Sequence, residues 1–84
     1  MTYIKSLGVT LMKYDDEFYI VVGEEPYEVN ETSARIFDLC NGRDSLDDMC
    51  RKMLTIFDYE EASMRGDIVT LLDELKSIGA IAEV

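Results

Sequence analysis

The hydrophobic pattern of this chain changes its period at Asn30. "PYEVNETSARIFDLCNG", residues 26–42, starts as a short alternating segment and continues with helical spacing. Asn30 is a good N-cap residue, and Glu31 places a negative charge in the first turn, where it is favoured. The apolar stripe that follows has the spacing i, i+3, i+4, i+7 and consists of Ser33, Ile36, Phe37 and Cys40. A strand is therefore predicted to run directly into a helix, and we expect that helix to end at the Asn41–Gly42 pair.

Three segments upstream of Asn30 are predicted as strands, at residues 8–14, 18–22 and 27–29. The segment "FYIVVG" is apolar on both of its faces, which is typical of a central strand. The acidic stretches "DDE" at 15–17 and "GEEP" at 23–26 predict the two connecting turns. Because Pro26 has no backbone donor, the strand that follows it is expected at an edge.

Two further helices follow. Ser45 and Asp48 form an S-x-x-D capping box. The stripe behind it consists of Leu46, Met49, Cys50, Met53, Leu54 and Phe57. The third helix is predicted to start at Asp58 or just after it and to end at Gly79, before an extended "AIAEV" terminus. Its buried face is predicted to hold Met64, Ile68, Leu71, Leu75 and Ile78, with Leu72 at the margin.

The order of these elements predicts an α+β fold. A three-stranded antiparallel sheet is followed by three helices, an arrangement that is winged helix-turn-helix-like. The connections are too short for separate domains, so residues 1–84 are expected to form a single domain with one small core.

Charge and hydropathy exclude several classes of partner. The net charge of −10 repels phosphate backbones and anionic lipid, and the eight basic residues are scattered along the chain. We therefore expect neither nucleic-acid binding nor membrane binding. No apolar run is long enough to span a bilayer, and the N-terminus lacks the features of a secretory signal, so we expect a cytoplasmic protein.

Residues for catalysis, metal binding or cofactor binding are missing. The chain has no histidine, so no serine or cysteine has the usual general base. Cys40 and Cys50 lack the spacing of a metal site and lie on predicted apolar stripes, so both thiols are expected to be reduced and buried. The paired acidic residues fall in predicted turns and near helix starts, where local structure accounts for them. We expect no catalytic residues, no metal and no cofactor, and hence not an enzyme but a protein-binding module.

Two long segments carry a resemblance to a known family. "EVNETSARIFDLCNGRDSLDDMCRKM" and "GDIVTLLDELKSIGAI" are similar to the PqqD family, named for the pyrroloquinoline quinone biosynthesis protein D. The resemblance covers most of the chain, from about Val9 to Ile81. The positions that match the family's motifs are Asn30, Glu31, Thr32, Gly42, Asp67, Ile68, Leu71, Leu72, Leu75, Gly79 and Ile81. Each motif is weak alone, but their joint order and spacing are fairly specific.

This resemblance implies a recognition element for ribosomally synthesised and modified peptides. The leader region of a precursor peptide would add as a strand beside the third strand and against the third helix. A modifying enzyme or leader peptidase would then act on the precursor, and a lasso-peptide pathway is favoured. The implied peptide-binding residues are Tyr27, Glu28, Val29, Asp67, Ile68, Leu71, Leu72 and Leu75. The expected state is a monomer or a weak dimer, because exposed strand edges permit pairing.

Other functions stay open at this point. The same family implies a peptide chaperone for a radical enzyme as an alternative. A winged-helix nucleic-acid binder is also possible from the fold, although the net charge argues against it. A small structural subunit of an enzyme complex, with no peptide ligand, is the remaining reading.

Overall fold

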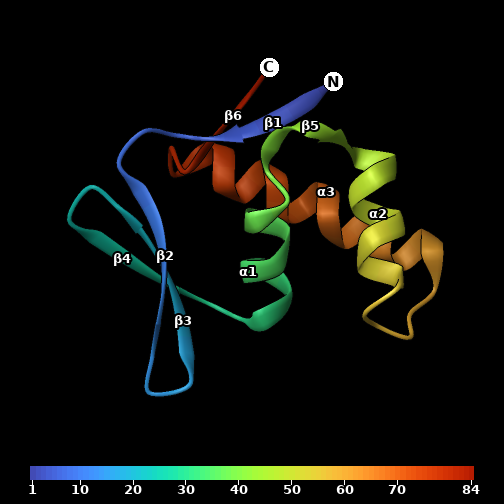
Figure 1. The fold of residues 1–84 in the computed structure, drawn as a ribbon, viewed down its shortest axis with the longest axis horizontal. Helices are drawn as coiled ribbons and strands as arrows, with labels where there is room; N and C mark the ends of the chain where they lie inside the picture. The colour runs from blue at the N-terminus through green and yellow to red at the C-terminus, as the bar shows by residue number, and fades with distance from the viewer.

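A computed structural model describes all residues from 1 to 84. Figure 1 shows a sheet of hairpins standing to one side of three helices, with both chain termini close together on a second sheet. The elements in chain order are β1 (Thr2–Lys5), β2 (Val9–Tyr14), β3 (Glu17–Val22), β4 (Glu25–Val29), α1 (Glu31–Asp38), β5 (Asn41–Ser45), α2 (Leu46–Leu54), α3 (Glu61–Ser77) and β6 (Ile81–Glu83).

The hairpin sheet has the order β2-β3-β4, with both pairs antiparallel. Each turn has two residues. Asp15 and Asp16 have φ of 53° and 66°, the conformation of a type I′ turn, whereas Gly23 alone is left-handed in the second turn, with φ of 64°. The central place of β3 and the edge place of β4 confirm the predictions made from "FYIVVG" and Pro26.

A second sheet, with the order β5-β1-β6, was not predicted. Its strands come from the two termini and from the segment between α1 and α2, so its pairings join residues far apart in sequence: Ile4 lies opposite both Asn41 and Ala82. The pattern of "NGRDS" gave no signal because it lacks alternating apolar residues. The fold is therefore α+β as predicted, with six strands in two sheets rather than three strands in one, and the winged-helix description fits only loosely.

Polar side chains hold β5 in place. Asn41 Oδ1 accepts hydrogen bonds from the backbone N–H groups of Arg43 and Asp44, at 2.8 and 2.9 Å. The carboxylate of Asp44, which is only 9% exposed, accepts from Asn41 Nδ2 at 3.0 Å and from Lys52 Nζ at 2.7 Å. The bond from Lys52 is the main reason that the pKa of Asp44 lies below its ordinary value. These bonds replace the hydrophobic alternation that normally specifies a strand.

The helix N-termini follow the predicted caps in two cases of three. Asn30 Oδ1 accepts from the N–H of Ser33, and Ser45 and Asp48 form the full capping box. α3 instead begins at Glu61 with no side-chain cap. Two predicted helix ends were wrong: α1 ends at Asp38 because the next residues enter β5, and α2 ends at Leu54 before a short turn. Gly79, with φ of 79°, ends α3 as predicted.

The core lies between the helices and the inner face of the hairpin sheet. Its buried members come from β3, the three helices, the start of β6 and the residues next to α1 and β6: Ile20, Ile36, Phe37, Cys40, Met49, Cys50, Met53, Met64, Ile68, Leu72, Leu75, Ala80 and Ile81. Both cysteines are free and buried, as predicted. Burial raises the pKa of the Cys40 thiol to about 11. None of the helices is both long and apolar enough to cross a membrane.

Candidate functional site: a free strand edge beside a helical pocket

The outer edge of β4 has no neighbouring strand. The register pairs Val22 with Glu25 across a two-residue turn, Ile20 with Tyr27 and Phe18 with Val29. Residues that flank such a turn exchange both backbone hydrogen bonds, and bonded and non-bonded pairs then alternate along the ladder. The backbone of Tyr27 and Val29 thus faces β3. The groups on the free edge are the carbonyl of Pro26 and both the N–H and the carbonyl of Glu28.

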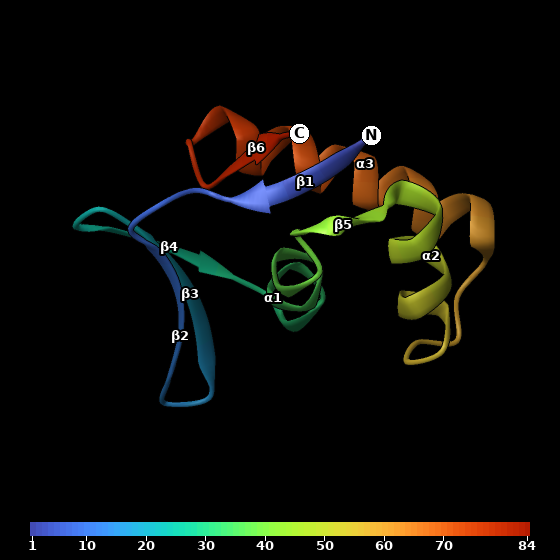
Figure 2. The ribbon, with the colours of Figure 1, turned by 45° about the horizontal axis from the view of Figure 1, so that its top comes forward.

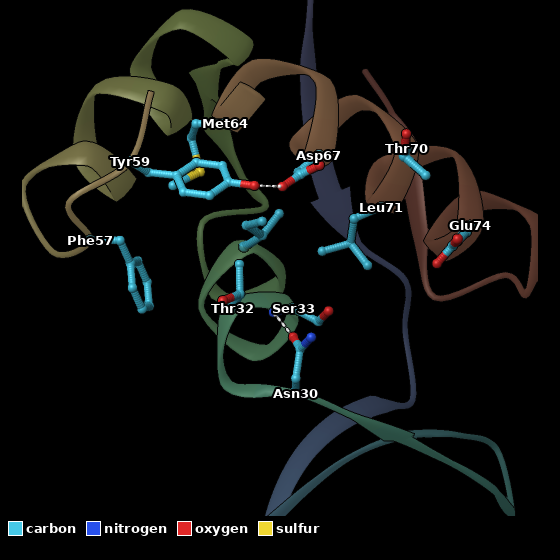
Figure 3. Close-up of a pocket in the computed structure, with 11 residues that line it drawn as sticks. Asn30, Thr32, Ser33, Phe57, Tyr59, Met64, Asp67, Thr70, Leu71 and Glu74 are labelled. Atoms are coloured by element: carbon cyan, nitrogen blue, oxygen red, sulfur yellow. Dashed lines mark hydrogen bonds between the residues drawn. The ribbon is translucent and has the colours of Figure 1, made fainter. Parts of the chain in front are cut away.

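A pocket lies at the end of β4 (Figure 3). Asn30, the residue directly after β4, is one of the residues that line this pocket. Its volume is about 420 Å³, and it separates the start of α1 from α3. Ile36, Met64 and Leu71 supply apolar surface from the two helices. The other lining residues are Asn30, Thr32, Ser33, Phe57, Tyr59, Asp67, Thr70 and Glu74. This combination of an apolar interior with a polar rim suits an apolar side chain of a peptide whose backbone stays near the surface.

Hydrogen bonds within the chain order the rim of this pocket. The hydroxyl of Tyr59 donates to Asp67 Oδ2 at 2.8 Å, which Figure 3 shows as a dashed line across the top of the pocket. That bond to a carboxylate is the main cause of the raised pKa of Tyr59. On the opposite side, Asn30 Oδ1 accepts a hydrogen bond from the N–H of Ser33 at 2.8 Å. The Asn30 side-chain NH₂ group is therefore left to donate to a ligand.

A second, acidic hollow lies at the same end of β4. It has a volume of about 530 Å³ and includes Asn30, which it shares with the first pocket. Four carboxylates line it, those of Asp16, Glu17, Glu28 and Glu31. A hydrogen bond shared with Glu17 raises the pKa of Glu28, as expected for two carboxyl groups close together. A basic side chain would relieve this repulsion.

The structure places the predicted site residues in two groups. Tyr27 (36% exposed), Glu28 and the half-buried Val29 lie on β4, and Asp67 and Leu71 line the pocket. The other three, Ile68, Leu72 and Leu75, are 0–2% exposed and belong to the core. Leu72 was placed at the margin of the buried stripe, and that placement was wrong. Leu71 lies there instead, because the observed phase of α3 turns residue 72 inward.

Several pocket residues were missed by the sequence analysis. Phe57 and Tyr59 lie in the segment between α2 and α3. Phe57 was assigned to the buried stripe of the second helix, and no periodic pattern marks Tyr59. Met64 was assigned to the core, and it lies both there and in the pocket wall. The signal that could have found Thr70 and Glu74 is their spacing from Asp67 and Leu71. Thr70 is three residues after Asp67 and Glu74 is three after Leu71, and residues three and four apart share one side of a helix.

Solved structures share this small α+β fold. One, described as "Lasso peptide synthetase B1 complexed with the leader peptide", has a TM-score of 0.83 at 19% identity and covers 99% of this chain and 100% of its own. "TbiB1 in Complex with the TbiA(beta) Leader Peptide" has a TM-score of 0.81 at 13% identity, covering 96% of each chain.

A third structure is the PqqD truncation of Methylobacterium extorquens PqqCD, described as a functional, stand-alone RiPP recognition element. Its TM-score is 0.83 at 16% identity, over 96% of this chain and 88% of its own. The family model described as "Coenzyme PQQ synthesis protein D (PqqD)" matches residues 17–81. The chain therefore belongs to the PqqD family, as its sequence motifs indicated. No curated protein matches its sequence.

Proposed function

We propose that this domain binds the leader region of a ribosomally synthesised precursor peptide and presents it to a modifying enzyme or leader peptidase. The leader segment adds as a strand along the free edge of β4, and one of its apolar side chains enters the pocket between α1 and α3. The main support for the proposal is that the free edge of β4 leads directly, through Asn30, into the pocket. Family membership and the leader complexes of two proteins with the same fold support it.

The electrostatics favour a leader with basic residues beside its apolar anchor. Asp67 and Glu74 lie on one side of the anchor pocket, and the acidic hollow with Glu17 and Glu28 lies on the other. Opposite charges around a short strand would fix its register and speed its association. The domain has no role in the chemistry under this proposal; it raises the concentration of the precursor at the enzyme.

The pathway in which the domain acts has two candidates. A lasso-peptide pathway is favoured by the 100% coverage of the lasso peptide synthetase B1 chain, which this chain matches almost end to end. A quinone-cofactor or other radical-enzyme pathway is favoured by the family model and by the PqqD truncation. Titration with leader peptides from each pathway distinguishes them, because a specific leader should bind at least tenfold tighter than the other.

Strand addition is tested by removing the single free backbone donor of β4. Glu28→Pro keeps the β3 pairing, because the Glu28 N–H faces outward, and should weaken leader binding about fivefold, since a lost backbone hydrogen bond costs about 1 kcal/mol before any steric clash. Glu28→Gln is the matched control, because it keeps the N–H and removes the charge. The measurement is fluorescence polarisation of a labelled leader peptide, with circular dichroism to check folding.

Added salt separates the contribution of the Glu28 charge to leader binding from that of its backbone N–H. In about 0.5 M salt, exposed charge pairs are screened and Glu28→Gln should bind like the parent, while Glu28→Pro should stay weak. Equal binding by a folded Glu28→Pro variant would show that the peptide does not pair with β4.

A further inference from the structure

The two acidic residues of α3 that line the pocket between α1 and α3 have no basic partner. α3 carries four acidic residues, and Asp67 and Glu74 are the two that line the pocket. The other two, Glu61 and Asp73, each pair with a basic residue of the same helix, at 4.0 and 3.7 Å. Neither Asp67 nor Glu74 forms an ion pair anywhere in the chain. None of the 11 lining residues is basic, so these two charges are left for a ligand to neutralise.

Asp67, Leu71 and Glu74 form a row along one face of α3, which Figure 3 shows at the side of the pocket. At about 100° and 1.5 Å per residue, the three residues lie within about 60° of one another around the helix axis. Along that axis, Leu71 is about 6 Å from Asp67 and about 4.5 Å from Glu74. An apolar side chain that lies over Leu71 therefore has a carboxylate on either side of it.

A peptide strand matches this row in direction and in spacing. Figures 1 and 2 both show β4 and α3 running along similar lines in opposite directions, so a strand added at β4 continues along α3. The side chains on one side of a strand recur at every second residue, about 6.6–6.8 Å apart. When one of them occupies the pocket, its neighbours on the same side lie near Asp67 and Glu74. The flexible stem of a lysine or arginine covers the remaining difference of about 1–2 Å.

Tyr59 orients one of the two carboxylates. Its hydroxyl donates to Asp67 Oδ2 at 2.8 Å, which ties the segment between α2 and α3 to the middle of α3. Tyr59 is 48% exposed and lines the pocket, so this bond lies at the rim. The bond restrains the rotation of the carboxylate and leaves Oδ1 free to accept a hydrogen bond from a ligand.

We propose that the leader carries lysine or arginine two residues before and two residues after its apolar anchor, and that Glu74 and Asp67 bind these two side chains. The inference rests on the proposed function and adds to it the sequence pattern that the site selects. The pattern, basic-x-apolar-x-basic, reads the same in both directions, so it holds for a leader that pairs with β4 in either orientation. Tyr59 acts as a positioning residue for Asp67.

The first experiment determines the preferred sequence without assuming a leader. A display library of random peptides of about 12 residues, long enough to pass both β4 and the pocket, is selected on the immobilised domain. Lysine and arginine should be enriched two residues away from an apolar residue, on both sides of it. Enrichment at the adjacent positions instead, or no preference for basic residues, overturns the inference. If the domain selects no peptide whose binding depends on Leu71, the proposed function itself is rejected.

The second experiment assigns the two charges to α3 by titrating one enriched, labelled peptide in low salt with fluorescence polarisation. Asp67→Asn/Glu74→Gln should weaken binding about fivefold, as two partly exposed ion pairs allow. The matched control is Glu61→Gln/Asp73→Asn, which also removes two charges from α3 but outside the pocket, and it should bind within twofold of the parent. In about 0.5 M salt the difference between the two variants should disappear.

A third variant tests the positioning role of Tyr59. Tyr59→Phe removes the hydroxyl and keeps the ring, so it should weaken binding of the enriched peptide about threefold, as loss of one hydrogen bond to a carboxylate allows. Binding of the same peptide with its basic residues replaced by glutamine should not change, whereas a purely structural role would weaken both. The inference is overturned if the folded Asp67→Asn/Glu74→Gln variant binds like the parent in low salt. It is also overturned if the control variant loses as much affinity, since overall charge alone would then explain the effect.

Discussion

Two neighbouring leucines of α3 should separate folding from peptide binding. Leu72 is 2% exposed within the core, so Leu72→Ala leaves a cavity that the surrounding helices cannot fully close. Such truncations cost roughly 2–5 kcal/mol. In a domain of this size, 1 kcal/mol corresponds to about 4–8 °C in melting temperature. We therefore expect Leu72→Ala to lower the melting temperature by about 8–40 °C.

Leu71→Ala should behave in the opposite way. Leu71 is half-buried and its side chain lines the pocket between α1 and α3 (Figure 3). Truncating an anchor contact typically costs about 1–3 kcal/mol of binding free energy, which weakens the dissociation constant about 5- to 150-fold. The melting temperature should fall by less than about 8 °C, because the lost side chain was partly exposed.

The assay combines melting curves with leader titration by fluorescence polarisation, at a temperature where every variant is folded. Val69→Ala is the control, since Val69 is an apolar residue of the same helix that is 40% exposed and outside the pocket. It should leave both measurements nearly unchanged. The assignment of the pocket fails if folded Leu71→Ala binds within twofold of the parent. The assignment of the core fails if Leu72→Ala melts like the parent.

Three further predictions concern the scaffold, two on its stability and one on the accessibility of a buried thiol. Ser45→Ala removes one half of the capping box of α2 and should lower stability by about 1 kcal/mol, or about 4–8 °C, with Ser45→Asp restoring most of the loss; an unchanged melting curve would contradict the cap. The pKa of Asp44 is lowered in the folded state, mainly by Lys52, so its contribution is present above the unfolded pKa of about 3.9 and is lost as the pH falls through the folded pKa. Asp44→Asn should therefore flatten the acid side of a melting-temperature profile from pH 7 to 2, and identical slopes would refute this. The Cys40 thiol is buried with a pKa of about 11, so a thiol reagent at pH 7.5 should modify it only in denaturant, and rapid labelling of native protein would show that it is accessible.

Local chemistry accounts for the parts of the fold that could be predicted. Asn30 caps α1, and Ser45 and Asp48 cap α2, because a side-chain oxygen two or three residues away satisfies the first backbone donors without help from the rest of the chain. The two faces of "FYIVVG" marked a central strand, since β3 must be covered by neighbours at its edges and by helices on one side. These signals depend only on residues close in sequence.

The second sheet depends on residues that are distant in sequence. Figure 2 shows β1, β5 and β6 lying together above α1, although they come from the start, middle and end of the chain. The segment Asn41–Ser45 holds its strand conformation through Lys52 and its own turn, and the choice of its partner, β1, is a tertiary one. For the same reason α1 ends four residues before Gly42, whose left-handed φ of 79° serves the strand rather than a helix end.

By itself the sequence determined the order of the three hairpin strands and the three helices, the family, the absence of histidine chemistry and the acidic charge of the hairpins, but not the strand β5 between α1 and α2. Only the tertiary structure decided which side of α3 meets the core, because a shift of one residue, about 100° around the helix, exchanges Leu71 and Leu72 between pocket and interior. It also brought Tyr59 to Asp67, eight residues away, and placed the pocket at the end of β4. Periodicity fixes the spacing of side chains along an element, but packing against the other elements fixes its rotation, and the site lies where that rotation leaves a gap.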